Sequence, residues 1–267
     1  MTDGPVRFAT FLAPNMIGVY RFVADYVGRE VGVPTELAVG SSFDQFAAGE
    51  ADVGFICGLP YVHLAREPYP PVELLAAPLL QGERYEGRPI YFSDVIVQVD
   101  SPYQSFPDLR GRTWAFNDPD SHSGYNVTRH RLVSMGETRG FFGRVVEAGS
   151  HQRSIRMVCS GEVDAAAIDS QVLAVELRDH PELGAQLRVI DALGPAGIQP
   201  VVAASSLPDE LKAAIRAALL AMGHDPVARV RLAHGFIERF VPVTDEDYDD
   251  VRAMLVAAEE ASFLTLK

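Results

Sequence analysis

The feature that most constrains the fold is a regular alternation of strand-like and helix-like segments along almost the whole chain. A first strand-like run covers Val6 to Leu12, and a second covers Glu36 to Val39. Between them, apolar residues recur at helical spacing from Met16 to Val31. Such alternation is typical of α/β proteins, in which helices cover largely parallel sheets. We therefore predict an α/β fold.

The alternation divides into two similar halves, and 267 residues are enough for two cores of ordinary size. The first half ends with a strand-like run over Val72 to Leu80, and the second begins after the extended run Ile90 to Val99. A strand over Thr113 to Phe116 opens this second half, with predicted helices at 124–135, 152–160 and 171–178. The chain closes with predicted helices at 208–222, 226–235 and 245–261, with no strand between the last two.

We expect these halves to form two Rossmann-like lobes. Lobe one is predicted to take residues 1–94 and 201–267, and lobe two residues 95–200. Two extended crossings, near 93–99 and 199–203, would then join the lobes as a hinge. The C-terminal helical segment is predicted to pack on lobe one as a cap.

The formal net charge of −13 argues against a nucleic-acid partner, which requires a basic surface, and against an anionic membrane surface. An anionic ligand would have to be held by local donors such as helix N-termini. No apolar run approaches the roughly 20 residues that span a membrane. Cys57 and Cys159 are predicted to lie in different lobes, so we expect no disulfide bond between them. We also expect the protein to be a monomer.

The first residues, Met1 to Phe8, hold neither a basic segment nor an apolar one, so no signal peptide is predicted in this chain. The expected compartment is extracytoplasmic or periplasmic if a leader precedes this sequence, and cytoplasmic otherwise.

The most informative segment runs from Ala115 to Tyr125, where a predicted strand leads through a polar turn to small residues at a helix start. Ser121 and Ser123 would add hydroxyl donors to the unpaired backbone N–H groups there, and Gly124 would let a ligand approach the backbone. A small oxyanion suits such a place. Alternatively, one of the two serines only caps the helix, and the spacing alone leaves both interpretations open.

Other polar and aromatic residues stand at the ends of predicted strands and helices. His151 follows a strand and could donate to an oxyanion, or it could be a surface or capping histidine. Asp169 could orient a donor or cap a helix. Tyr91 lies beside the first crossing, and Phe43 and Tyr61 stand at helix starts of lobe one. Each of these three rings could reach a ligand or pack in the core.

Signatures of catalysis are weak. The chain has no G-x-S-x-G, no glycine-rich phosphate loop, no H-E-x-x-H and no C-x-x-C motif, and its seven histidines lack metal-ligand spacing. Ser121, His151 and Asp169 could be imagined as a catalytic triad, but nothing in the sequence indicates their mutual geometry. We expect a protein that is not an enzyme and that uses no metal and no cofactor.

Four segments together resemble the phosphonate-, phosphite- and phosphate-binding proteins of ABC importers, which have the type 2 periplasmic-binding-protein fold. They are Asp108 to Tyr125, Gly149 to His151, Gly161 to Ser170 and Ala48 to Gly54. Their order and spacing match across most of the chain, and the first segment is the most specific. The resemblance implies a solute-binding protein that closes around a small oxyanion between its lobes, with an ABC transporter permease as partner.

In that family a Ser-Thr-Ser-Gly turn surrounds the phosphonate oxygens. The matching residues here are Ser121, His122, Ser123 and Gly124, so an imidazole replaces the hydroxyl of the middle threonine. The resemblance also implies that Tyr91 and His151 contact the ligand.

Two further departures bear on the ligand. Phe43 stands where relatives have a tyrosine, which would remove one oxygen contact. Gln171 and, in a poorer match, Gln199 stand where relatives that bind aminoalkyl phosphonates carry carboxylates. The resemblance therefore implies a bare oxyanion, or one with an uncharged tail, rather than an aminophosphonate.

Two functions of other classes stay open because no signal peptide is predicted. One is a cytoplasmic enzyme on the same fold, such as the chorismate dehydratase of menaquinone synthesis, which also lacks a signal. The other is a cytosolic ligand sensor. The motif match favours binding, whereas the fold alone would not, because one fold hosts many functions.

Overall fold

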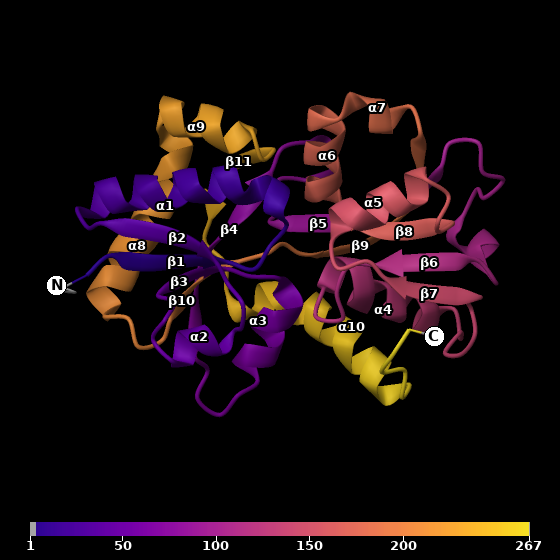
Figure 1. Ribbon diagram of the computed structural model, residues 1–267. Helices are drawn as coiled ribbons and strands as arrows, with labels where there is room; N and C mark the ends of the chain where they lie inside the picture. The colour runs from indigo at the N-terminus through magenta and orange to yellow at the C-terminus, as the bar shows by residue number, and fades with distance from the viewer. Residues whose placement is uncertain (1–3, 267) are drawn as a thin grey trace. The chain divides into compact units, whose positions relative to one another are not determined.

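The computed structural model describes residues 4–266, and the chain divides into two compact units (Figure 1). Unit 1 contains residues up to Ile90 together with Gly197–Tyr248, and unit 2 contains Tyr91–Ala196 and the segment that starts at Asp249. The start of the segment Met1 to Phe8, in which no signal peptide is predicted, lies outside the described residues. Within residues 4–266, no helix has the length and apolar character needed to cross a membrane.

Unit 1 is built on a mixed six-stranded sheet in the order β11-β4-β10-β3-β1-β2. The strands are β1 (Val6–Thr10), β2 (Thr35–Val39), β3 (Val53–Phe55), β4 (Val72–Leu80), β10 (Val201–Ala204) and β11 (Ile237–Val241). β1 pairs in parallel with β2 and β3, whereas β10 lies antiparallel between β3 and β4. The prediction of largely parallel sheets therefore needs a correction. β10 enters the sheet directly from the other unit, without the crossover helix that a parallel strand requires.

Helices cover both faces of this sheet. α1 (Ile17–Val31) packs against α8 (Asp209–Ala221) and α9 (Pro226–Ala233), and α2 (Asp44–Ala47) and α3 (Gly58–Ala65) lie on the opposite side (Figure 1). The helical spacing predicted for α1 is confirmed, because Tyr20, Val23 and Val27 are all buried. The helix ends at Gly32, whose φ of 75° is left-handed and costs glycine least.

β11 was not expected, since no strand was predicted between the last two helices. It pairs antiparallel with β4, and its register shifts between Ile237 and Arg239. Its buried residues, Ile237 and Phe240, are separated by two exposed charged residues. The alternation of period 2 that reveals a strand is therefore broken in this segment.

Unit 2 is built on a five-stranded sheet in the order β7-β6-β8-β5-β9. The strands are β5 (Ile90–Gln98), β6 (Thr113–Phe116), β7 (Arg144–Glu147), β8 (Ala165–Asp169) and β9 (Leu187–Gly197). β6 pairs in parallel with β7 and β8, and β5 is antiparallel to β8. β4 and β6 begin and end at the predicted residues. β5 resembles β10 in two ways: each is the first strand after a crossing, and each runs antiparallel to a strand that precedes or follows the crossing in its own sheet, β8 for β5 and β3 and β4 for β10.

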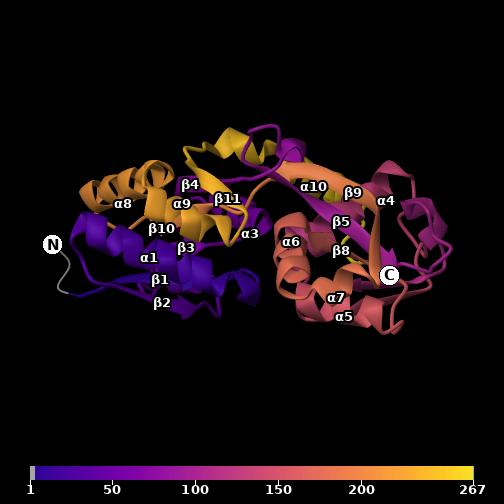
Figure 2. The same ribbon diagram turned by 90° about the horizontal axis from the view of Figure 1, so that it is seen from above.

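Side chains alternate between the two faces of the second sheet. Val95, Val97 and Trp114 point into one apolar cluster, whereas Ile96 and Ala115 belong to the other. The first cluster is covered by α4 (Val127–Ser134) and the second by α5 (His151–Cys159) and α6 (Ser170–Asp179). Figure 2 shows α5, α6 and the short α7 (Pro181–Gly184) grouped together.

The last helix, α10 (Asp249–Glu260), corrects the predicted domain assignment. It was expected to cap lobe one, but it belongs to unit 2 and packs against α4. Phe263 and Leu266, which follow it, are buried in the same apolar cluster as Trp114. The chain therefore crosses between the units three times rather than twice. The sequence reveals that a helix is amphipathic, but not which exposed apolar face receives it.

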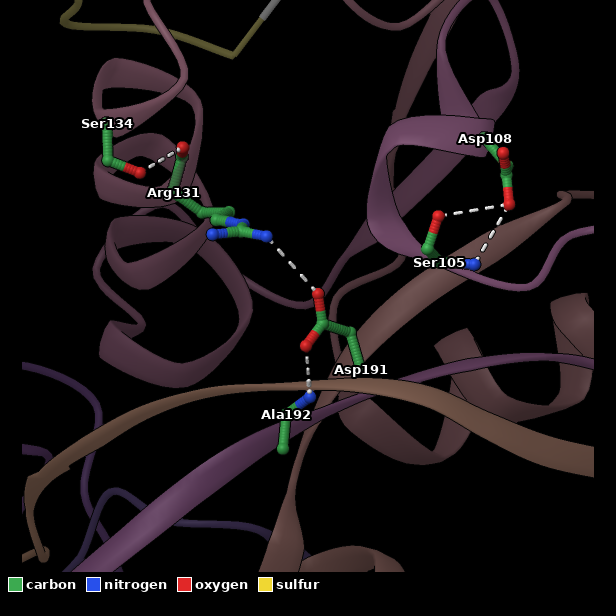
Figure 3. Close-up of polar contacts among 6 residues, drawn as sticks. All are labelled: Ser105, Asp108, Arg131, Ser134, Asp191 and Ala192. Carbon is green, nitrogen blue, oxygen red and sulfur yellow. Dashed lines mark hydrogen bonds and ion pairs between the residues drawn. The ribbon is translucent and has the colours of Figure 1, made fainter.

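Polar contacts fix α4 within unit 2 (Figure 3). The guanidinium of Arg131 lies 3.6 Å from the carboxylate of Asp191 on β9, and that carboxylate also accepts from the N–H of Ala192 at 2.9 Å. Before β6, Ser105 and Asp108 form a reciprocal capping box on the short 3-10 helix η3 (Phe106–Leu109). The contact with Asp191 thus ties α4 to β9, and the capping box fixes the short helix that precedes β6.

Cys57 lies in unit 1 and Cys159 in unit 2, and no disulfide bond joins them. Across residues 4–266, no group of three His, Cys, Asp or Glu side chains is placed to hold a metal ion.

Candidate functional site

The segment singled out in the sequence forms a single wide turn between β6 and α4. This turn, η4 (His122–Asn126), is π-helical: the N–H of Asn126 donates to the carbonyl of Ser121 at 3.1 Å. All five of its residues are buried. Such turns are rare and occur frequently at functional sites, because they widen a helix start and redirect its side chains.

The two serines of this turn have different roles. Ser121 is the N-cap, and its Oγ accepts from the N–H of Gly124 at 3.1 Å. The capping interpretation therefore holds for Ser121. The hydroxyl of Ser123 instead lies 2.9 Å from Nε2 of His151 and 3.3 Å from Oγ of Ser121. The structure thus brings together three predicted site residues from two separate strand-to-helix connections.

His151 is the first residue of α5 and is only 6% exposed. Ser150 caps this helix, accepting from the N–H of Arg153 at 3.2 Å, so His151 itself is not the cap. The Nδ1 atom of His151 is buried and has no hydrogen-bond partner. Its ring therefore has one nitrogen committed to Ser123 and the other unused.

His122 and His151, the two histidines of the site, are neutral near pH 7. Burial lowers the pKa of His151 to about 4. Burial, together with the nearby charges of His130 and Arg129, lowers the pKa of His122 to about 3. An anion at this site would meet donors from neutral imidazoles, hydroxyls and backbone amides rather than a cationic pair.

The lowered pKa values predict a loss of stability in weak acid. An unfolded histidine titrates near pH 6.5, so between there and about pH 4 the unfolded chain binds more protons than the folded one. The free energy of unfolding should therefore fall as the pH falls through this range, by about 1 kcal/mol per pH unit for each histidine. Urea unfolding at about pH 7, 6 and 5 measures the slope. The double variant H122Q/H151Q should flatten it, whereas H180Q, at an exposed histidine, should not. An equal slope in all three proteins would contradict the prediction.

The geometry of a catalytic triad is absent from these residues. Asp169 ends β8 and caps α6, and its carboxylate accepts from the N–H groups of Gln171 at 2.8 Å and Val172 at 3.2 Å. Since Nδ1 of His151 has no partner, Asp169 does not orient that ring. Of the two interpretations left open for Asp169, the structure shows the helix cap.

Tyr91 and Gln171 are placed in the same unit. Tyr91, on β5, is 1% exposed, and its ring centroid lies 6.3 Å from that of His122. Gln171, in the first turn of α6, is 4% exposed. The pairing of β5 with β8, in which Ser93 faces Asp169, sets the relative position of these two segments.

Phe43 and Tyr61 belong to unit 1. The half-buried ring of Phe43 contacts Phe11, with centroids 4.6 Å apart. Tyr61 is buried in α3, and its hydroxyl donates to Asp245 at 2.8 Å while its ring packs on Tyr248. Both residues thus take part in packing within their own unit, and ligand contact by either stays a prediction.

Gly124 is required by a close approach inside the site. A Cβ atom placed there would lie 1.8 Å from Oδ1 of Asn117, far inside van der Waals contact. The side chain of Asn117 therefore lies directly over the backbone of the turn. Its Oδ1 is buried without a hydrogen-bond partner.

Sequence reasoning missed three polar residues near these side chains: Gln152, Asn126 and Arg129. Gln152 follows His151, is 7% exposed, and has no partner for either side-chain nitrogen or oxygen. Asn126 and Arg129 are also buried. Gln152 could have been recognised from the sequence as a polar residue on the buried side of a helix start. No local pattern distinguishes the other two.

Comparison with known proteins identifies relatives for most of the chain. A model of the family described as the periplasmic substrate-binding protein of phosphonate ABC transporters matches residues 9–248. The phosphonates-binding periplasmic protein of Escherichia coli (strain K12) is 31% identical over 110 residues, which is 39% of this chain. That match covers 32% of the relative, about a third of its length.

Solved structures share the fold over nearly the full length. A binding protein component of an ABC phosphonate transporter from Pseudomonas aeruginosa superposes with a TM-score of 0.84 at 18% identity, covering 99% of this chain and 90% of that one. A Prochlorococcus marinus (MIT 9301) protein in complex with methylphosphonate has a TM-score of 0.82 at 16% identity, covering 97% and 98%. The chain therefore has the type 2 periplasmic-binding-protein architecture that was expected.

Proposed function

Because the chain belongs to the family of periplasmic substrate-binding proteins of phosphonate ABC transporters, we propose that it binds a small phosphorus oxyanion at the turn from Ser121 to Gly124. The candidate ligands are phosphonate, phosphite and phosphate. The protein then delivers its ligand to an ABC importer, acts outside the cytoplasm and catalyses no reaction.

The observation that carries this proposal is the cluster of Ser121, Ser123 and His151, which the turn η4 and the start of α5 bring together. The hydroxyl of Ser123 lies 3.3 Å from that of Ser121 and 2.9 Å from Nε2 of His151, and all three residues are buried. Hydroxyl donors and backbone N–H groups at a helix start favour a negative charge. Buried neutral donors can hold an anion even though the chain carries a net charge of −13.

The non-catalytic role is supported by the unpartnered Nδ1 of His151. A serine activated by histidine requires a third group that orients the imidazole. Asp169, the predicted candidate, caps α6 instead. The contact between Ser123 and His151 therefore suits anion binding better than nucleophilic attack.

The ligand is proposed to lack an amine. A carboxylate that could pair with an ammonium group is absent at Gln171. We therefore expect methylphosphonate, phosphite or phosphate to bind more tightly than aminoethylphosphonate. Isothermal titration calorimetry with these four ligands tests the order. Tighter binding of aminoethylphosphonate would contradict it.

A thermal-shift panel tests the ligand class directly. Phosphate, phosphite, methylphosphonate, sulfate and chorismate are each added to the full chain. A ligand at about 100 times its dissociation constant should raise the free energy of unfolding by about 2.7 kcal/mol. A shift with chorismate alone would favour the enzyme alternative, and no shift with any phosphorus oxyanion would overturn the proposal.

Ser123→Ala is expected to weaken binding of the ligand found in this panel by about 10- to 100-fold, because a hydrogen bond to a charged group contributes about 1.5–3 kcal/mol. The matched control is Ser134→Ala at the end of α4, the helix that follows the turn, where the hydroxyl donates to the carbonyl of Arg131. Calorimetry should show wild-type affinity for the control. Equal affinities of both variants would remove Ser123 from the site.

Gln152→Met tests whether the buried amide serves the ligand. An unsatisfied buried polar group costs about 1–3 kcal/mol, so the ligand-free variant should be more stable than wild type by about 1 kcal/mol, yet bind the oxyanion more weakly. The matched control is Gln98→Met, because the amide of Gln98 donates to the carbonyl of Cys159 at 2.9 Å. That variant should lose stability and keep its affinity. Urea unfolding and calorimetry measure both effects, and a destabilised Gln152→Met protein with unchanged affinity would contradict the prediction.

A further inference from the structure

A chain of buried hydrogen bonds connects the proposed binding turn to α4, the helix that follows it. Nη2 of Arg129 lies 2.7 Å from Oδ1 of Asn126, and Nδ2 of Asn126 lies 3.2 Å from Nδ1 of His122. Arg129 is 6% exposed and the other two residues are 0% exposed. Water therefore does not compete for these contacts.

The chemistry of these groups decides which atom carries each proton. A guanidinium only donates, so the atom of Asn126 that faces Arg129 must be its oxygen. The amide nitrogen of Asn126 must then face His122, and it too only donates. Nδ1 of His122 is therefore the acceptor and holds no proton. In a neutral imidazole the proton then lies on Nε2.

A charged imidazole does not fit this arrangement. It would carry a proton on Nδ1 and set it against the N–H₂ group of Asn126, with the cation Arg129 and His130 nearby. The lowered pKa of His122 agrees with this geometry.

Arg129 is itself held by the C-terminal segment of the chain. Its Nη1 donates to the carbonyl of Leu264 at 3.0 Å, and its guanidinium lies 5.1 Å from the ring centroid of Tyr125. The hydroxyl of Tyr125 in turn accepts from the N–H of Leu266 at 3.1 Å. The guanidinium is thus held between the turn η4 and the residues that follow α10.

We propose that Arg129 is a positioning residue that acts through Asn126 to hold His122 as the tautomer protonated at Nε2, so that this ring offers the oxyanion a donor and never an acceptor. The inference rests on the proposed function, because it takes the turn from Ser121 to Gly124 as the binding site. The replacement of the family's threonine by His122 then has a consequence. A hydroxyl can donate or accept a hydrogen bond, whereas this imidazole only donates to the ligand. An imidazole that only donates favours an ionised ligand oxygen over a protonated one.

The first test reads the tautomer in the ligand-free protein. Nitrogen-15 NMR of the imidazole distinguishes a protonated ring nitrogen from a bare one, and His122→Gln assigns the signals. At about pH 8, where histidines are neutral, wild type should show a bare Nδ1 and a protonated Nε2 at His122. In Asn126→Asp the carboxylate keeps its contact with Arg129 but accepts from His122, so the proton should move to Nδ1. A protonated Nδ1 in wild type, or no change in Asn126→Asp, would overturn the proposal.

A pair of matched variants tests the role of Arg129. In Arg129→Gln the constraint on the amide of Asn126 is lost, and both tautomers of His122 should appear in the spectrum. Arg131→Gln removes a cation from the same helix, the one that faces Asp191 (Figure 3), and should leave the wild-type tautomer. If Arg129→Gln keeps a single Nε2–H tautomer, Arg129 has no positioning role.

The binding consequence is measured separately by calorimetry with methylphosphonate and inorganic phosphate at about pH 8. Asn126→Asp should weaken the tighter of the two by about 10- to 100-fold, since a donor to a charged group becomes a lone pair that faces it. Unchanged affinity despite a shifted tautomer would remove His122 from the ligand and overturn the proposal. Failure of wild type to bind either anion would overturn the proposed function, whereas the tautomer assignment would still stand on the NMR result.

Discussion

Replacing Gly124 with alanine is expected to reduce oxyanion affinity by about 100-fold or more. The added Cβ would lie 1.8 Å from Oδ1 of Asn117, so either that side chain or the turn must move. Overpacking of this kind costs about 1–3 kcal/mol, and a displacement of the turn separates Oγ of Ser121 from the N–H of Gly124. The same movement would disturb the contact between Ser123 and His151, on which the proposed site depends.

The measurement combines calorimetry with the tightest ligand of the panel and urea unfolding of the ligand-free chain. The control is Gly18→Ala: its Cβ would meet nothing within 4 Å, and the residue lies in the exposed part of α1. Alanine is a better helix former than glycine, so this control should gain about 0.5–1 kcal/mol of stability and keep its affinity.

A double variant separates the clash from the loss of the glycine. In N117A/G124A the oxygen that would meet the new Cβ is gone, so part of the lost stability should return. Wild-type affinity in the single variant Gly124→Ala would contradict the binding role of this turn.

Replacing Trp114 with alanine is expected to have the largest effect on stability, a loss of about 3–5 kcal/mol in the free energy of unfolding. The indole is 0% exposed, stacks on Phe142 with centroids 4.7 Å apart, and meets Phe106 edge-on at 5.7 Å. Its removal leaves a cavity in the apolar cluster against which β6 packs. The chain runs from β6 into the turn η4. Reduced affinity should accompany the reduced stability.

Urea unfolding measures this prediction, with two comparison variants. Trp114→Phe should lose much less than Trp114→Ala, because it keeps a ring and removes an indole N–H that is buried without a partner. Tyr69→Ala, at a residue 91% exposed, should change stability by less than about 0.5 kcal/mol. A loss at Trp114→Ala no larger than at Tyr69→Ala would show that the aromatic cluster does not stabilise unit 2.

The local elements were predictable because each depends on neighbours in the sequence. β4 and β6 begin and end where apolar runs predicted them, and α1 follows its helical spacing to the glycine at its end. The helix start after β6 was predicted from small polar residues following a strand. The resemblance to a family added the candidate residues of that turn, and the family itself is confirmed by the comparison over residues 9–248.

Other features depend on contacts between residues far apart in the chain. α10 was assigned to the wrong lobe because its amphipathic pattern fits any apolar face, and β11 was missed because its alternation is broken. The short distance between Ser123 and His151 arises from the pairing of β6 with β7, which sets two connections side by side.

Most of the succession of strands and helices was therefore predictable from the sequence, which also singled out the segment proposed to hold an anion. Periodicity and capping chemistry act over a few residues, so they can be read along the chain. Three features needed the three-dimensional arrangement. Ser121 caps the turn while Ser123 contacts His151. Asp169 caps α6, and Arg129 reaches His122 through Asn126. Those outcomes depend on directions and distances between side chains, which are set when the sheet and its helices pack.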